Sequence, residues 1–155
     1  MIRRAAEADI DRLNELLYQV QSLHAGKRPD IFKPGAKKYT SQELEAIIAN
    51  DMTPIFVHEE DGVVTGYAFC IYQITKENEQ LYERKVLYID DLCVDKPYRR
   101  KHIGQKLYEY VLETARENGC DSVTLNVWRV NPSAEQFYRK MGMRPLKTTM
   151  ETILD

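Results

Sequence analysis

Apolar residues in the first third of the chain recur every three or four positions, which is the spacing of one helix face. Residues 8–20 are therefore predicted to form a helix, preceded by a short strand at residues 2–4. A second helix is predicted from Thr40, a residue type that caps helix N-termini, to Ile48. The connection at residues 26–35 is too rich in proline and glycine to form a regular element.

The middle of the chain changes to the alternation and the apolar runs that are typical of strands. Residues 54–59 and 63–74 flank the turn-forming residues 60–62, so a β-hairpin is predicted. A charged stretch, residues 76–83, separates this hairpin from a further apolar run at residues 86–94. That run predicts a buried strand.

The second half of the chain alternates between helix and strand patterns. Residues 103–118 predict an amphipathic helix that stops at Gly119, residues 122–128 a strand, and residues 131–142 a last helix. The tail, residues 144–154, predicts one or two closing strands. The order indicates an α/β (α+β) fold, with six to seven strands in a mixed sheet and about four helices on its two faces.

Composition and charge narrow the class of protein. A single domain over residues 1–155 is long enough to bury a sizeable core. The net charge of −2 argues against nucleic acid as a partner, and no apolar run is long enough to span a membrane or to form a signal peptide. Cys70, Cys93 and Cys120 lack metal-ligand spacing. We therefore expect buried free thiols, no metal and a cytoplasmic location.

The strongest functional signal lies in residues 92–107, where a strand, a basic loop and a helix start follow one another. Free backbone N–H groups at a helix N-terminus bind anions, and the helix dipole favours negative charge there. Arg99, Arg100 and Lys101 add positive charge just before the helix that contains Gly104. This arrangement predicts a cofactor that carries a pyrophosphate.

Three familiar nucleotide-binding patterns do not occur in the sequence. No pair of widely spaced glycines precedes a Lys-Ser or Lys-Thr pair, as a Walker loop requires. The glycine fingerprint of dinucleotide-binding folds is also missing from the first strand–helix unit. A protein kinase domain would need a longer chain.

Two segments resemble the GCN5-related N-acetyltransferases. Residues 94–104 are similar to the acetyl-CoA-binding segment of that family, Arg/Gln-x-x-Gly-x-Gly/Ala, with Arg99 first, His102 in place of the first glycine and Gly104 last. Residues 131–143 are similar to its Asn-x-x-Ala-x-x-Phe-Tyr-x-Lys-x-Gly-Phe segment. We expect His102 to take ordinary right-handed helical geometry, so that its side chain points away from the phosphates while its N–H donates.

The resemblance implies a mostly antiparallel sheet with a splayed groove for acetyl-CoA, the co-substrate. It implies transfer of the acetyl group to a primary amine of an unidentified acceptor by direct attack in a ternary complex. The end of the strand at residues 86–94 would hold the pantetheine arm like an added strand, and Asn131 would bond a pantetheine amide or cap the last helix. The implied cofactor-binding residues are Leu92, Cys93, Val94, Arg99, Arg100, Lys101, His102, Ile103, Gly104, Gln105, Lys106, Asn131 and Tyr138.

The catalytic candidates are a tyrosine and two carboxylates. Tyr138 matches the tyrosine of the family that protonates the leaving thiolate, with Phe137 expected to pack inward; the alternative role of Tyr138 is that of a core aromatic. Because neighbours on a strand face opposite sides, one of Asp90 and Asp91 is expected to face the acceptor and act as base, unless the pair is merely a charged strand end.

The acceptor site is predicted to be built by the first two helices and their connection, with Trp128, just past its strand, as a wall of the pocket or a packing residue. Its candidate residues mix charge with aromatic rings and are His24, Arg28, Phe32, Tyr39 and Trp128; a solvated surface loop is the alternative. We expect a small-molecule amine, or an amine of a peptide or protein, as acceptor, no nucleic acid or membrane as partner, and a possible homodimer. A noncatalytic acyl-CoA-binding regulatory domain on the same fold is the alternative function.

Overall fold

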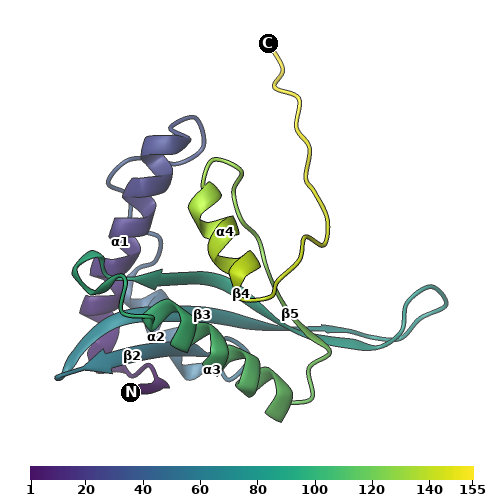
Figure 1. Ribbon diagram of the computed structural model, residues 1–155, viewed down its shortest axis with the longest axis horizontal. Helices are drawn as coiled ribbons and strands as arrows, with labels where there is room; N and C mark the ends of the chain where they lie inside the picture. Colours follow the sequence, from purple (N-terminus) through teal and green to yellow (C-terminus); the bar gives the residue numbers. More distant parts are fainter.

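A computed structural model describes all residues, 1–155, as a five-stranded sheet with helices on both faces (Figure 1). The strands are β1 (Ile2–Arg4), β2 (Ile55–Glu60), β3 (Val63–Thr75), β4 (Arg84–Val94) and β5 (Ser122–Leu125). The helices are α1 (Ile10–Lys27), α2 (Ser41–Ala49), α3 (Ile103–Glu117) and α4 (Pro132–Lys140), with short 3₁₀ turns at Glu7–Asp9 and Lys96–Tyr98. None of these helices is long and apolar enough to cross a membrane.

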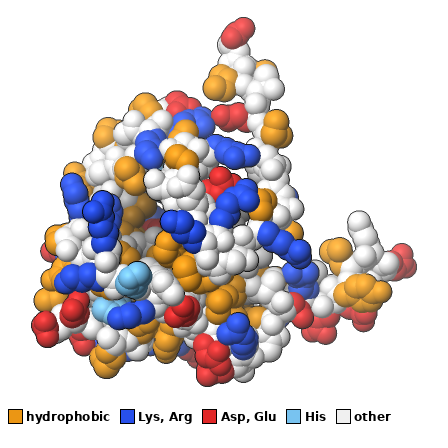
Figure 2. Space-filling model, in the orientation of Figure 1, with side chains coloured by type: hydrophobic (Ala, Val, Ile, Leu, Met, Phe, Trp, Pro, Cys, Tyr) orange, Lys and Arg blue, Asp and Glu red, His pale blue; other side chains and the backbone are white.

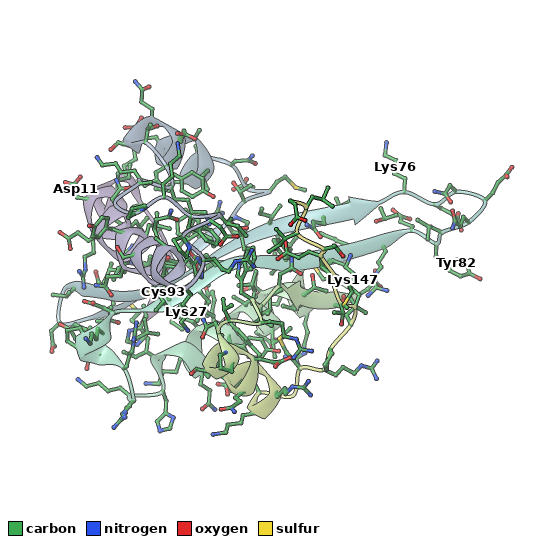
Figure 3. The ribbon with its side chains drawn as sticks, turned by 90° about the horizontal axis from the view of Figure 1, so that it is seen from above. Asp11, Lys27, Lys76, Tyr82, Cys93 and Lys147 are labelled. Carbon is green, nitrogen blue, oxygen red and sulfur yellow. The ribbon has the colours of Figure 1, made fainter.

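The strands follow one another across the sheet in chain order. Neighbouring strands are antiparallel from β1 to β4, and only β4 and β5 are parallel. The predicted mixed, mostly antiparallel sheet is therefore confirmed, with five strands rather than six to seven. The β3–β4 hairpin extends beyond the body of the molecule, with Lys76 and Tyr82 near its tip (Figure 3).

The one or two closing strands predicted at residues 144–154 are not present in the structure. No regular element follows Lys140, and the last residues leave the body of the molecule as an extended tail (Figure 1). No backbone hydrogen bond involves residues 144–155. A strand requires a neighbour that satisfies its N–H and C=O groups, and the tail has none within its own chain.

Two hydrophobic cores hold the helices against the sheet. On one face Leu13 and Leu16 of α1 and Leu44 of α2 are completely buried, whereas Leu107 and Val111 of α3 are buried on the other face. We call these cores the α1-side core and the α3-side core.

The predicted cap of α2 is present: the Thr40 hydroxyl accepts from the Glu43 N–H at 3.1 Å.

A β-bulge in β4 changes the face to which its side chains point. Phe69 of β3 pairs with Asp91, but Cys70 pairs with Ile89, so Asp90 is the additional residue. Ile89 belongs to the α3-side core and Cys93 to the α1-side core. In a regular strand these two residues, four apart, would share one face.

Candidate active site

The strands β4 and β5 part in the middle of β4. Their pairing runs from Val86 with Ser122 to Ile89 with Leu125 and stops there. Beyond it, the only strand that pairs with β4 up to Val94 is β3. Residues 90–94, which we call the free edge of β4, therefore have no strand neighbour on the side facing away from β3. The splayed sheet expected from the sequence is present.

The basic loop before α3 presents a row of free donors. The backbone N–H groups of residues 100–105 donate to no group of the chain, and the first helical bond runs from Lys106 N–H to the His102 carbonyl at 3.0 Å. Arg99 donates from Nε to the Val94 carbonyl at 3.2 Å, which ties the loop to the end of β4. Free N–H groups at a helix N-terminus, together with the helix dipole, are the components of an anion site.

His102 does not take the conformation expected for it. Its φ is +61° and that of Arg100 is +68°, so both residues lie in the left-handed region. The expected right-handed geometry at His102 is wrong because the chain must reverse sharply here to begin α3. A glycine adopts this conformation freely, whereas a side chain costs about 1–2 kcal/mol. This left-handed conformation explains why the family pattern has a glycine at the position of His102.

Helix α4 crosses the first turns of α3 with two adjacent rings. A Cβ on Gly104 would lie 3.3 Å from Cζ of Phe137, so the absent side chain leaves room for that ring. The ring of Tyr138 lies next to Tyr108, one turn further along α3, at 6.1 Å between centroids. Both rings are half-buried. Phe137 is therefore not the inward-packed member of the pair, because Gly104 and Tyr108 lie on one face of α3 and each receives one ring.

Tyr138 lies in an environment that keeps its hydroxyl protonated. Burial raises the pKa of this phenol well above its ordinary value, and the negative charge of Asp91 adds to the effect. The side chain packs against the α3-side core. It therefore carries a proton at any physiological pH.

The carboxylates of Asp90 and Asp91 interact with Lys38, a residue that was not a candidate from the sequence. Lys38 places its Nζ 3.3 Å from Oδ2 of Asp90, and the Tyr67 hydroxyl donates to Oδ2 of Asp91 at 2.8 Å. Burial raises the pKa of Asp91, and the Lys38 ammonium and the Tyr67 hydroxyl oppose this rise. Burial disfavours the charged form of Lys38, but Asp91 and Asp90 together raise its pKa above the ordinary value.

The alternation rule predicted that Asp90 and Asp91 face opposite sides of the sheet. The rule does not apply at the bulge, where Asp90 is the additional residue. Neither Lys38 nor Tyr67 was a candidate from the sequence. Tyr67 lies within an apolar strand, where a buried tyrosine usually has a hydroxyl partner, and that expectation was the available signal.

Three predicted acceptor residues form a row of rings. His24 lies 4.9 Å from Phe32, and Phe32 meets the edge of Trp128 at 5.4 Å, measured between ring centroids. The row joins the end of α1 to the connection between β5 and α4. Burial lowers the pKa of His24, and the charge of Asp91 opposes this effect.

The other two predicted acceptor residues have different surroundings. Tyr39 stacks on Phe69 at 6.0 Å between centroids and packs against the α1-side core, with Lys38 over its ring. Arg28 is engaged elsewhere: it donates to both carboxylate oxygens of Asp30, at 2.9 and 2.7 Å, and to Glu151 of the tail. The structure thus brings Tyr39 beside the lysine and directs Arg28 away.

Asn131 occupies the N-cap position of α4 without capping the helix by its side chain. Its N–H donates to the Trp128 carbonyl at 2.9 Å, and its side-chain amide makes no hydrogen bond within the chain. The amide is therefore free to meet a ligand. No group of three or more His, Cys, Asp or Glu side chains is arranged to hold a metal ion.

The sheet, the free edge of β4 and the free N–H groups before α3 define an α+β protein with a helix N-terminus beside a parted pair of strands. The model of the acetyltransferase (GNAT) family matches residues 17–143. The chain belongs to this family.

Two curated relatives carry names of N-acetyltransferases. An uncharacterised N-acetyltransferase of Methanocaldococcus jannaschii is 27% identical over 141 residues, which cover 91% of this chain and 59% of that protein. The glucosamine 6-phosphate N-acetyltransferase of Trypanosoma brucei brucei is 31% identical over 98 residues, 62% of this chain and 61% of that protein. The chain therefore spans 59% and 61% of the length of these relatives.

Two solved structures share the fold. A crystal structure of a protein from Bacillus halodurans, studied as a tetramutant, superposes with a TM-score of 0.95 at 29% identity over 99% of both chains. An aminoglycoside N-acetyltransferase in complex with CoA gives a TM-score of 0.75 at 15% identity over 100% of this chain and 99% of that chain. The second likeness shows the fold alone.

Proposed function

We propose that the chain transfers the acetyl group of acetyl-CoA to a primary amine, by direct attack of the amine in a ternary complex. The observation that carries the proposal is the set of free N–H groups at residues 100–105 next to the free edge of β4. Together they provide donors for a pyrophosphate and an unpaired strand edge for an extended amide-bearing arm. Acetyl-CoA, the co-substrate of the family, has both parts.

The cofactor-binding residues follow from this fit. Residues 99–106 hold the pyrophosphate through their backbone N–H groups and through the positive side chains of the loop. Residues 92–94 bond the pantetheine arm and polarise the thioester carbonyl with backbone N–H groups. Asn131 supports the assignment because its amide is free to bond a pantetheine amide. Acetyl-CoA supplies the acetyl group as a thioester.

The carboxylates prepare the amine for attack. The incoming ammonium binds at Asp90 and Asp91, in the place where Lys38 now contributes positive charge. Asp91, whose pKa is raised by burial, accepts the ammonium proton directly or through water. The neutral nitrogen then attacks the thioester carbonyl. A C–N bond forms, the C–S bond breaks, and the nitrogen releases its second proton to water, which leaves a neutral amide.

Tyr138 serves the leaving group. The phenol, kept neutral by burial, gives its proton to the departing thiolate and regains one from solvent. The Tyr138–Tyr108 contact holds its ring in place.

The acceptor is proposed to be a small-molecule amine or an amine of a peptide or protein. The row of His24, Phe32 and Trp128 offers an aromatic wall, and the negative charge of Asp91 acts on His24 within it. This combination suits a cationic amine with apolar or planar surface. The amino sugar phosphate and aminoglycosides in the names of relatives fall within this class of cationic amines. We further propose that residues 1–155 act as one domain in the cytoplasm and that the protein binds neither nucleic acid nor membrane.

The test combines calorimetry with a thiol-release screen. Calorimetry with acetyl-CoA and with CoA should show binding of both, and the screen over amines and peptides should show release of free thiol with one class of acceptor. Absence of CoA binding would contradict the proposal. Binding without transfer to any amine would favour the second candidate, a noncatalytic acyl-CoA-binding regulatory domain.

A further inference from the structure

Lys38 is the only lysine of the chain that forms an ion pair. Its Nζ lies 3.3 Å from Oδ2 of Asp90, whereas an arginine supplies the positive charge in every other ion pair of the structure. Figure 2 shows Lys and Arg side chains spread over one face of the molecule, where water solvates their charge. The side chain of Lys38 is only 36% exposed, so its amine is held at a carboxylate rather than in bulk solvent.

The amine of Lys38 lies in the field of both carboxylates at the bulge. Burial disfavours its charged form, but Asp91 and then Asp90 raise its pKa above the ordinary value. Burial raises the pKa of Asp91 in turn, and the Lys38 ammonium is the first of the groups that oppose this rise. Lys38 is therefore an ammonium beside the proposed base, which is the arrangement that an acceptor amine needs before it attacks.

The proposed thioester site lies directly beside these carboxylates along β4. Asp91 precedes Leu92, whose backbone N–H is among those proposed to polarise the thioester carbonyl. Because the Cα atoms of successive residues are about 3.8 Å apart, an amine held at Asp91 lies one residue from the carbon that it would attack. Lys38 thus has the position of an acceptor that is tethered to the chain.

The segment that carries Lys38 is free to move its amine toward that carbon. No helix or strand lies between the end of α1 at Lys27 and the start of α2 at Ser41, and no backbone–backbone hydrogen bond involves residues 33–39. The neighbouring Tyr39 stacks on Phe69 and packs against the α1-side core, which keeps the segment beside the site. A tethered amine needs no second molecule to be bound and oriented before the reaction.

We propose that the protein acetylates its own Lys38 when acetyl-CoA is bound and no acceptor is present. This inference rests on the proposed function, because it uses the same base, the same thioester site and the same acid. Lys38 gives one ammonium proton to Asp91, and its nitrogen attacks the thioester carbonyl. A C–N bond forms, the C–S bond breaks, and the nitrogen releases its second proton to water. Tyr138 protonates the departing thiolate and regains a proton from solvent.

The product has a neutral amide at position 38, which no longer pairs with Asp90. Each chain therefore reacts once. In the absence of an added amine, the protein should release one equivalent of CoA thiol in a single phase and then stop. Because donor and acceptor belong to one complex, the rate constant should not depend on the protein concentration.

Peptide mapping by mass spectrometry tests the proposal. The purified protein is incubated with isotope-labelled acetyl-CoA and no amine, then cleaved at acidic residues, because trypsin would separate Lys37 from Lys38. Lys37 is the matched internal control, since it is exposed and forms no ion pair. We expect the label on Lys38 to form at least ~10-fold faster than on Lys37. Equal labelling of the two lysines, or no label on Lys38, would overturn the proposal.

Two variants test the chemistry of the step. Asp91→Asn should slow labelling of Lys38 by ~10²-fold or more because the base is lost, with circular dichroism to verify its fold. Lys37→Arg should leave the labelling of Lys38 unchanged. Labelling at the wild-type rate in a folded Asp91→Asn protein would also overturn the proposal. If CoA binds and an added amine is acetylated while Lys38 stays unlabelled, this inference fails alone; if CoA does not bind, the proposed function fails with it.

Discussion

The ammonium of Lys38 lies 3.3 Å from a carboxylate oxygen of Asp90, at the single bulged position of β4. A lysine of the chain thus already stabilises negative charge where the proposed acceptor amine would bind. This relationship makes Lys38 a sensitive point for both acceptor affinity and the pH dependence of the reaction.

Replacing Lys38 with methionine should shift the acidic limb of kcat/KM to higher pH. The Lys38 ammonium lowers the pKa of Asp91, so its removal raises that pKa further. A base must be deprotonated to act, so activity is lost at a higher pH as the solution is acidified. The measurement is a pH–rate profile of the variant against Lys38→Arg, which keeps the charge. Profiles that coincide for all three proteins would remove Asp91 from the role of base.

Tyr138→Phe should reduce kcat by ~10²-fold or more while the Kd for acetyl-CoA stays within about twofold. The ring remains to pack on Tyr108, so only the proton donor is lost. Steady-state thiol release gives kcat, and calorimetry gives the Kd. Tyr108→Phe is the matched control, because it alters the neighbouring hydroxyl. An equal loss of kcat in the control would indicate that the two tyrosines act through packing.

His102→Gly should stabilise the fold by about 1 kcal/mol, because glycine takes the left-handed conformation at +61° without strain. Urea unfolding of the wild type, His102→Gly and His102→Ala provides the comparison. Alanine keeps a Cβ in the same conformation, so its stability should remain near that of histidine. Equal stability of the glycine and alanine variants would show that the loop carries no strain at this residue.

Gly66→Ala should destabilise the protein by about 1–3 kcal/mol and weaken acetyl-CoA binding. A Cβ at this position in β3 would lie 2.8 Å from the backbone carbonyl oxygen of Cys93, on the free edge of β4. The edge must shift to admit it. Gly26→Ala is the control, because nothing lies within 4 Å of that position in α1 and alanine favours helices. It should be neutral or stabilising by about 1 kcal/mol.

Because of Asp9, the free energy of unfolding should fall as the pH is lowered into the acid range. Its carboxylate accepts from both terminal nitrogens of Arg3, at 2.8 and 2.9 Å, and this hydrogen bonding lowers its pKa below the ordinary value. The stabilisation is complete above the unfolded-state pKa and is lost as the pH falls through the folded-state pKa. Asp9→Asn should cost on the order of 2 kcal/mol at neutral pH and should converge with the wild type in strong acid. A constant difference at all pH values would exclude this linkage.

Local patterns were sufficient for all the elements up to α4. The basic loop before Gly104 and the segment around Tyr138 each carry their signal within a few residues, so the proposal for the cofactor side of the site could be made from the sequence. The left-handed conformation of His102 could not be read from periodicity, because it depends on how the loop joins β4 to α3.

The acceptor side depends on contacts between distant segments. Lys38 meets Asp90 across 52 positions of the chain, and Tyr67 meets Asp91 across 24. The bulge permits both contacts. The order of apolar and polar residues in β4 does not distinguish this bulged strand from a regular one. The one or two closing strands at residues 144–154 were predicted from a pattern that is present, but this segment forms no backbone hydrogen bond with any strand of the sheet.

The bulge at Asp90 also determines the layer of the molecule from which each substrate of the proposed reaction approaches β4. Before the bulge, Ile89 packs in the α3-side core, and the first turn of α3 is the proposed anion site. After the bulge, Cys93 packs in the α1-side core. A strand without the additional residue would turn Asp91 toward α3, on the same side as the anion site. In the proposed reaction, one inserted residue therefore lets donor and acceptor reach a single strand from opposite layers of the molecule, without competing for the same face.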